Sequence, residues 1–428
     1  TDISFSTRFA GINSESADKS YNSYDSCQFS SMSVGVQTLR SVDTGFAIRY
    51  SHFSTFARGI DLDGGTAVEI RGNVITRARN FNSFQGIALG GQDGGIVVTG
   101  NTIDGRGLGG LLLEDQKHGP GNRGLIANNE ILCGGLFQAQ GIRIAGDLAF
   151  VDFVHNTVHC PAGLTATPFT LLSTPATGVR IANNIFSAPA GVVVYRQQSA
   201  DTLAYFDYNL FDGTQGVVAS IGGTNATDLA ALQALSGGNA NSLVALPQYR
   251  NPLTDLRPSA LAINNAGTPW PGITSDLMGQ PRDTLQPDVG AYEFDGLPVD
   301  IMPLAIQTPD NFSCEVLDST RVTVQLYNNG IQAISDFTVS YGIFAVTGAT
   351  EQVADTILSG DTLTYTFTQK VDISTPTLYP FKAWSSAVGD ANTGNDSVLF
   401  HPVFVDEVIQ NFPYIEDFDD PGGSVPDG

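Results

Sequence analysis

The 428-residue sequence predicts an all-β protein: a right-handed parallel β-helix of roughly eight coils with a helix-containing cap, followed by an Ig-like β-sandwich. Two observations predict the β-helix. A phrase centred on asparagine recurs every 25 to 28 residues, and a phrase that begins at glycine recurs in step with it. A third observation, short alternating runs between Gly and Asn turns after residue 302, predicts the sandwich.

The asparagine phrase reads GNVI at 72–75, GNTI at 100–103 and NNEI at 128–131, and it then continues in weaker form. Its central residues are Asn73, Asn101, Asn129, Asn156, Asn184 and Asn209, with Ser51 and Cys27 in the same place on the two preceding coils. Asparagine tolerates left-handed backbone angles, and stacked asparagine side chains can bond to one another. We therefore predict a ladder of asparagines at one turn of every coil.

Two apolar columns accompany the ladder. The first lies two or three residues before the asparagine: Ile48, Ile70, Val98, Ile126, Phe153, Ile181 and Phe206. The second lies in the glycine phrase: Ile60, Ile87, Leu111, Ile142, Val192 and Val217. Alternation with a period of two buries one face of a strand. Aligned columns require equivalent strands to stack in parallel.

The open end of such a stack needs a cap. Residues 226–237, ATDLAALQALSG, predict an amphipathic helix with Thr227 as its N-cap and Gly237 as its stop. The predicted domains are the β-helix at 1–222, its cap region at 223–296 and the sandwich at 297–405. Residues 406–428 are predicted to be a linker and the start of a further truncated module, so the chain is interpreted as a piece of a longer polypeptide with more domains.

Residues 228–294, which end in DVGAYEF, resemble the closing region of secreted parallel β-helix proteins of Bacteroidetes-type bacteria. That family carries a Ser-Pro-Ala-Ile-Asp phrase, from which this chain departs at Ala260 and Asn264. The resemblance implies the β-helix fold and a secreted or cell-surface location. Its members include polysaccharide lyases and many proteins without a known activity, so it implies no particular reaction.

The region at 303–403 resembles CARDB-like Ig-fold modules of bacterial surface proteins, on the phrases YNNG, GDTLTYTF and DANTGNDS. Such modules are usually spacers or binding domains. FPYIEDFDD at 412–420 resembles the first strand of an adhesion-type jelly-roll module. Large proteins of this layout often leave the cell by the type 9 secretion route, so the resemblance implies an extracellular multidomain protein.

The formal charge is −23 and the isoelectric point about 4.3. Nucleic-acid binding depends on Lys and Arg neutralising phosphates, so we expect no nucleic-acid partner. No stretch has the 18 or more apolar residues of a membrane span. The acidity is typical of a solvated surface, or of a surface that binds Ca²⁺, for which carboxylates are suitable ligands.

Apart from Arg71, which is an outward residue of the first strand, the candidate site residues lie at outward positions of the second strand of each repeat and in the turn that follows it. Possible Ca²⁺ ligands are Asp63, Asp93, Asp115 and Asp147; candidate catalytic residues are Lys117, His118 and Arg143; candidate substrate-binding residues are Arg71, Glu114 and Tyr195. In the lyase hypothesis, calcium neutralises a uronate carboxylate and a nearby base takes the adjacent proton. The alternative is that these are ordinary polar turn residues on a solvated face.

Two cysteines hold equivalent places on consecutive coils. Cys133 and Cys160 each lie four residues after a ladder asparagine. Stacked strands would put their backbones about 4.8 Å apart, which is within disulfide reach. A disulfide and a pair of buried thiols both fit this spacing.

Two functional hypotheses remain, and whether the chain is an enzyme stays open. The first is a non-catalytic part of a secreted or surface protein, in which the β-helix is a rigid stalk or adhesin that engages glycans or other surfaces. The second is a calcium-dependent lyase of uronate polysaccharides. The spacer module and the lack of a dense catalytic motif favour the first hypothesis.

Overall fold

The computed structural model describes residues 4–5, 10–14, 21–78, 83–134, 139–161, 167–173, 175–188, 192–212, 216–310, 312–313, 318–343, 346–375 and 377–405. The chain divides into two compact units, Thr1–Asp295 and Gly296–Gly428. Within the described residues, nearly all regular structure is β-strand and the single α-helix has 8 residues. No helix in this part of the chain is long and apolar enough to cross a membrane. The all-β prediction is confirmed.

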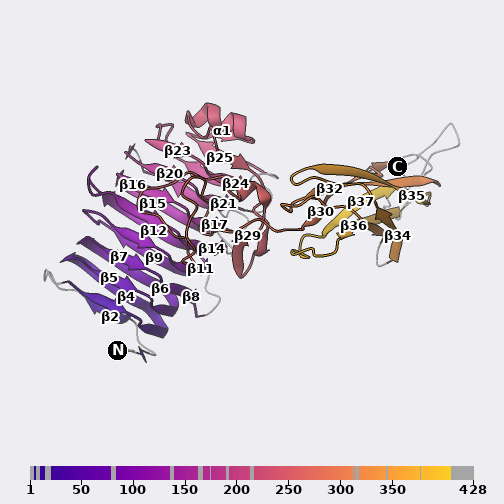
Figure 1. The fold of residues 1–428 in the computed structure, drawn as a ribbon. Coiled ribbons are helices and arrows are strands. Elements are labelled where there is room, and N and C mark those ends of the chain that lie inside the picture. The colour runs from indigo at the N-terminus through magenta and orange to yellow at the C-terminus, as the bar shows by residue number, and fades with distance from the viewer. Residues whose placement is uncertain are drawn as a thin grey trace, which may run out of the picture. The chain divides into compact units, whose positions relative to one another are not determined.

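The first unit is a β-helix whose coils each contribute one strand to a face, and the stacked strands are visible in Figure 1. Its first face is an 8-stranded sheet in which all neighbours are parallel. The strands are β3 (Ser23–Asp25), β5 (Ala47–Arg49), β7 (Glu69–Arg71), β10 (Val97–Thr99), β13 (Gly124–Ala127), β16 (Val151–Val154), β20 (Arg180–Ala182) and β23 (Tyr205–Asp207). The register pairs the predicted first apolar column from Ile48 through to Phe206.

The second face follows the asparagine turn. Its strands are β8 (Val74–Arg77), β11 (Thr102–Arg106), β14 (Glu130–Gly134), β17 (Thr157–His159), β21 (Ile185–Ser187), β24 (Leu210–Asp212) and β27 (Leu243–Val244). The third face consists of β9 (Gln85–Gly90), β12 (Gly109–Lys117), β15 (Gln140–Ala149), β18 (Thr167–Leu171), β19 (Ala176–Thr177), β22 (Tyr195–Gln197) and β25 (Ala219–Ile221). In the first coils β2 (Ala10–Ser14), β4 (Gln28–Thr44) and β6 (His52–Thr66) join these faces into one sheet, to which β1 (Ser4–Phe5) also belongs.

The glycines of the first four glycine phrases, Gly59, Gly86, Gly110 and Gly141, are required by close backbone approach. A Cβ at Gly59 would lie 2.5 Å from Ile75 and 2.6 Å from the carbonyl oxygen of Gly86, its counterpart one coil later. Any larger residue would therefore separate the coils at this corner. This is the physical reason for the recurring glycine phrase.

The asparagine ladder is continuous. Each ladder asparagine is fully buried. From Asn101 to Asn209, the Oδ1 of each accepts hydrogen bonds from the backbone N–H and the side-chain amide of the asparagine one coil earlier, at 2.9–3.2 Å. Ser51 and Cys27 extend the ladder towards the N-terminus. Ser242 ends it, because its hydroxyl accepts from the backbone N–H of Asn209 at 3.0 Å.

The expectation that the ladder asparagines themselves adopt left-handed backbone angles was wrong. The left-handed residue of each turn is the one before the ladder position: Gly72, Gly100, Asn128, His155, Asn183 and Tyr208, with φ between 51° and 67°. The ladder residue itself has a negative φ and points into the core. Asparagine is used there because its amide can both donate and accept, which satisfies buried backbone groups on the neighbouring coil.

The predicted helix closes the last coil. α1 (Leu229–Ser236) places Leu232 in the β-helix core, next to β25 and to β26 (Thr224–Ala226), which pairs antiparallel with β25. Its N-cap is Asp228, whose Oδ1 accepts from the N–H of Ala231 at 2.8 Å. The prediction of Thr227 as the cap was wrong by one residue. Gly237 ends the helix with a φ of 67°, as predicted.

Residues 245–294, here called the strap, fold back along the outside of the second face. They contain β28 (Tyr249–Asn251), β29 (Asp255–Pro258) and the short 3-10 helix η1 (Leu261–Ile263). Ile263 and Val289 of the strap pack on Ile185 and Leu210, which point outwards from β21 and β24. The DVGAYEF phrase is therefore structural in this chain, because it attaches the strap to the coils.

The second unit is a β-sandwich in the predicted region. A 3-stranded sheet contains β30 (Ile301–Thr308), β32 (Thr320–Asn328) and β35 (Thr362–Val371). A 5-stranded sheet contains β31 (Phe312–Ser313), β33 (Phe337–Ile343), β34 (Val346–Val353), β36 (Thr377–Ser386) and β37 (Ser397–Val405). Both sheets contribute to one core, which includes Val324, Phe367, Tyr341 and Phe381. The predicted further module at 406–428 lies outside the described residues.

Candidate functional site

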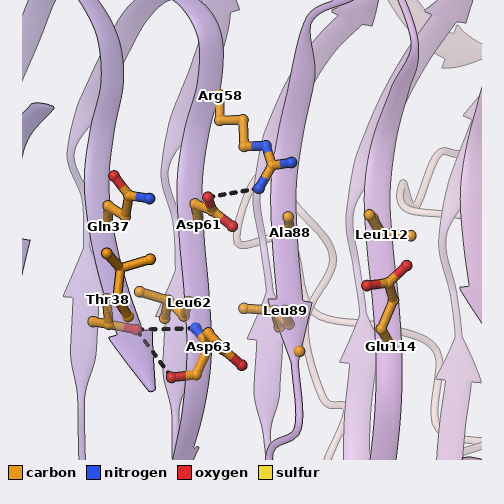
Figure 2. Close-up of a pocket in the computed structure, with 12 residues that line it drawn as sticks. Gln37, Thr38, Arg58, Asp61, Leu62, Asp63, Ala88, Leu89, Leu112 and Glu114 are labelled. Carbon is orange, nitrogen blue, oxygen red and sulfur yellow. Dashed lines mark hydrogen bonds and ion pairs between the residues drawn. The ribbon is translucent and has the colours of Figure 1, made fainter. Parts of the chain in front are cut away.

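A groove of about 360 Å³ lies on the third face, where Figure 2 shows its lining. The groove exists because β9 carries almost no side chain on its outer surface. Its outward residues are Ala88 and Gly90, whereas their partners on the flanking strands are Asp61 and Asp63 on β6 and Leu112 and Glu114 on β12. The longer side chains on both sides enclose a strip one strand wide.

Acidic groups dominate the groove. The Arg58 guanidinium forms an ion pair with Asp61 at 2.6 Å, which neutralises the charge of that carboxylate. The Asp63 side chain has no hydrogen-bond partner among the described residues, although its backbone N–H donates to Thr38 Oγ1 at 3.0 Å. Glu114 lies 3.6 Å from Arg143, a loose ion pair with both side chains partly exposed. The groove therefore presents carboxylate oxygens that are free to accept hydrogen bonds from a ligand.

Four predicted site residues lie close together at the C-terminal end of β12: Asp115 and Lys117 on β12, Asp147 on the neighbouring strand β15, and Asp93 after β9. Lys117 Nζ lies 2.7 Å from Asp147 Oδ2, and Asp115 Oδ1 accepts from the N–H of Asp147 at 3.0 Å. Asp93 pairs with Lys117 through an isolated parallel bridge. The carboxylate of Asp147, with Asp115 and Asp93 nearby, raises the pKa of Lys117 above its usual value. Lys117 is therefore held in its protonated, ion-paired form.

The predicted aspartates do not form a metal centre with the ligand density expected for calcium. Asp63 lies in the groove, whereas Asp93, Asp115 and Asp147 do not line it and lie near the C-terminal end of β12. Within the described part of the chain, no group of three or more His, Cys, Asp or Glu side chains is arranged to hold a metal ion.

His118, which directly follows β12, is a buried structural residue. Its side chain is 6% exposed, and Nδ1 accepts from the backbone N–H of Gly95 at 3.1 Å. Burial lowers the pKa of His118, so the ring is neutral at physiological pH. The ring joins two coils and does not reach the groove.

The prediction that Tyr195 binds a substrate was wrong. Tyr195 is fully buried, and its hydroxyl donates to Gln197 Oε1 at 2.8 Å. The predicted second column is correct for Ile60, Ile87, Leu111 and Ile142, but it continues through Phe169, Tyr195 and Ala219. Val192 and Val217 were assigned to it because they follow glycines. The aromatic ring of Tyr195 is inserted instead, next to Phe169 and Phe206.

Arg71 lies on another face from the other candidates. It belongs to β7 on the first face, where its Nε lies 2.8 Å from Glu69 Oε1. Glu69 also binds Arg49 at 2.5 Å, so these three residues form an ion-pair row across two coils. The structure therefore brings Glu114 and Arg143 together but does not bring Arg71 to the groove.

Cys133 and Cys160 form a disulfide between consecutive coils. Both are fully buried and pack with Ala139. Of the two alternatives that the spacing allowed, the structure has the bridged one.

Sequence reasoning missed the groove itself. Gln37, Arg58 and Ala88 line it, and none of them was a candidate. A signal was available: comparison of the outward residues of successive glycine phrases shows that 86–90, GIALG, has the shortest side chains. The sequence analysis looked for reactive groups, whereas the groove arises from missing side chains.

Comparison with known protein families agrees with this fold. The family model for a right handed beta helix region matches residues 10–199. The match and the stacked coils together show that the first unit contains a right-handed parallel β-helix. A search of curated proteins and a search of solved structures found no match.

Proposed function

We propose that this chain is a non-catalytic glycan-binding part of a secreted or cell-surface protein, and that its β-helix presents the third-face groove as the binding surface. The observation that carries the proposal is the free acceptor capacity of Asp63 and Glu114 on both sides of a shallow strip. Sugar hydroxyls are donors, and hydrogen bonds from hydroxyls to carboxylates are short and strong.

Rigidity supports this proposal. The groove spans strands β4 to β12, which belong to consecutive coils tied by the asparagine ladder. A preorganised wall loses little entropy when a ligand binds, so a few hydrogen bonds suffice for useful affinity. The extracellular location and the adhesin role are proposed from the sequence resemblance described above.

Titration calorimetry with the best ligand from a glycan array tests the proposal. The variant Asp63→Asn with Glu114→Gln keeps the size of both side chains and removes their charge. We expect binding to weaken by about 10- to 100-fold, because a hydrogen bond to a carboxylate contributes about 1.5–3 kcal/mol and one to a neutral amide about 1 kcal/mol, so each replacement loses about 1 kcal/mol. Asp355→Asn with Asp361→Asn, two exposed changes in the second unit, is the charge-matched control. Equal binding by the double variant and the parent would refute the groove as the site.

The lyase hypothesis remains as the second candidate because Lys117, Asp115 and Asp147 do lie together. The raised pKa of Lys117 argues against it, since a lysine that acts as a base needs a lowered pKa. Its test is the ultraviolet absorbance of unsaturated ends released from uronate polysaccharides, with and without calcium. Activity that is lost in Lys117→Ala and Arg143→Ala would establish the lyase and overturn the non-catalytic proposal.

A further inference from the structure

A second pocket, of about 250 Å³, lies in the strap and shares no lining residue with the groove. Arg250 on β28 and Arg257 on β29 provide its basic side, while Met278, Tyr292 and Phe294 provide an apolar side. Met278 is 64% exposed, so the apolar side is open to solvent. The pocket thus combines guanidinium groups with an uncovered apolar wall.

The acidic side chains of this pocket, Asp276 and Glu293, already accept hydrogen bonds from the protein on both carboxylate oxygens. Both oxygens of Asp276 accept from backbone N–H groups, at 2.7, 2.8 and 3.0 Å. Both oxygens of Glu293 accept from backbone N–H groups, and one also accepts from Arg282 Nη1 at 3.0 Å. Behind Tyr292, the buried carboxyl of Glu130 accepts a hydrogen bond from the tyrosine hydroxyl. These groups offer a ligand few acceptors.

The donors are not fully used. Arg257 donates hydrogen bonds from Nε and Nη2 to the Asp255 carboxylate, at 2.8 and 2.5 Å. Its Nη1 is left to donate to a ligand. The side chain of Arg250 has no hydrogen-bond or ion-pair partner among the residues that the structure describes. Hydrogen bonds from Arg257 lower the pKa of Asp255, and the charge of nearby Arg250 lowers it further. Arg257 is therefore paired with Asp255, whereas the Arg250 guanidinium has no paired carboxylate in the described part of the chain and is available to a ligand.

We propose that the strap pocket binds a small organic carboxylate. The carboxylate would pair with Arg250 and with the free Nη1 of Arg257, since a planar guanidinium matches a carboxylate in a bidentate geometry. The apolar body of the ligand would cover Met278 and Phe294. This inference is independent of the glycan proposal, because the two sites share no lining residue.

Saturation-transfer NMR of the whole chain tests this proposal, with benzoate as the probe and uncharged benzamide as its matched control. We expect benzoate to bind saturably and benzamide not to bind. Arg250→Gln should weaken benzoate binding by about 10-fold or more, since it removes a charged donor pair. Arg196→Gln, which changes an exposed arginine on the third face, should leave binding unchanged.

Three results would overturn the proposal. Absence of saturable benzoate binding would exclude the site, and equal binding by the Arg250→Gln variant would place the ligand elsewhere. Displacement of benzoate by an equal concentration of inorganic phosphate would show a general anion site without the apolar selectivity. None of these results depends on whether the groove binds a glycan.

Discussion

Replacement of Asn129 by alanine tests the asparagine ladder as the main polar support of the β-helix. Asn129 is in the middle of the ladder and is fully buried. Its Oδ1 accepts two hydrogen bonds from Asn101, at 3.1 and 2.9 Å. Its Nδ2 donates to the Val98 carbonyl and to Asn156 Oδ1, both at 2.9 Å. The substitution removes four buried hydrogen bonds that connect three coils.

The expected loss follows from these bonds. Each contributes about 1 kcal/mol net, so Asn129→Ala should cost about 4 kcal/mol of unfolding free energy. The backbone N–H of Asn101 would also lose its acceptor in a buried place, which adds to the cost. The melting temperature of the first unit should fall by about 8 °C or more, because 1 kcal/mol corresponds to about 2–4 °C in a large domain.

The assay must report on the first unit alone. The chain has two tryptophans, Trp270 in the strap and Trp384 in the sandwich. In a Trp384→Phe background, the fluorescence of Trp270 follows the β-helix, because Trp270 packs on Tyr205 and beneath Arg180. Urea titration of this background with and without the substitution gives the difference in unfolding free energy.

An exposed asparagine provides the control. Asn251→Ala removes one exposed side-chain bond, to the N–H of Leu253 at 2.9 Å, and should cost less than about 1 kcal/mol. If Asn129→Ala costs no more than Asn251→Ala, then the ladder contributes no special stability and the reasoning from buried hydrogen bonds is refuted.

Three further predictions concern the strap, the disulfide and the sandwich. Gly290→Ala should release the strap to limited proteolysis at a cost of about 2 kcal/mol, since φ is 93° and a Cβ would lie 2.5 Å from Ile185; an unchanged digestion pattern would contradict this. Reduction of Cys133–Cys160, which closes a separation of 27 residues, should lower stability by about 3 kcal/mol in urea titrations under reducing and oxidising conditions. Burial and two neighbouring aspartates raise the pKa of Asp396 to about 7, so sandwich stability should fall as the pH rises from about 4 to 7, and calorimetry of Asp396→Asn should show that fall reduced.

The sequence was sufficient for the repeating part of the fold. The ladder positions, the first apolar column and four members of the second column agree with the observed register. In a solenoid, each coil contacts only its neighbours, so a local pattern that recurs with a constant period also specifies the tertiary contacts. The helix cap and the sandwich were predictable for a similar reason, because their patterns are local.

The candidate site was predictable only in part. Sequence reasoning selected Asp63 and Glu114, which do line the groove, because acidic residues at outward strand positions are visible in the alternation. It also selected Tyr195, which is buried. After Ile142 the position of the glycine no longer predicts which residue of the strand points into the core, and Tyr195 pairs with Phe169 in the inward column. Once the spacing of the repeat changes, only side-chain packing decides which residue faces the core.

What the sequence by itself determined is the stack: its period, its parallel strands and the buried polar ladder. What only the tertiary structure decided is the surface: the groove over Ala88 and Gly90, the strap and its basic pocket. The groove depends on differences in side-chain length between neighbouring coils. The strap depends on contacts such as that between Ala291 N–H and Thr157 Oγ1, which are 134 residues apart in sequence. No local period can encode such contacts, because each is made once and between segments that differ in sequence.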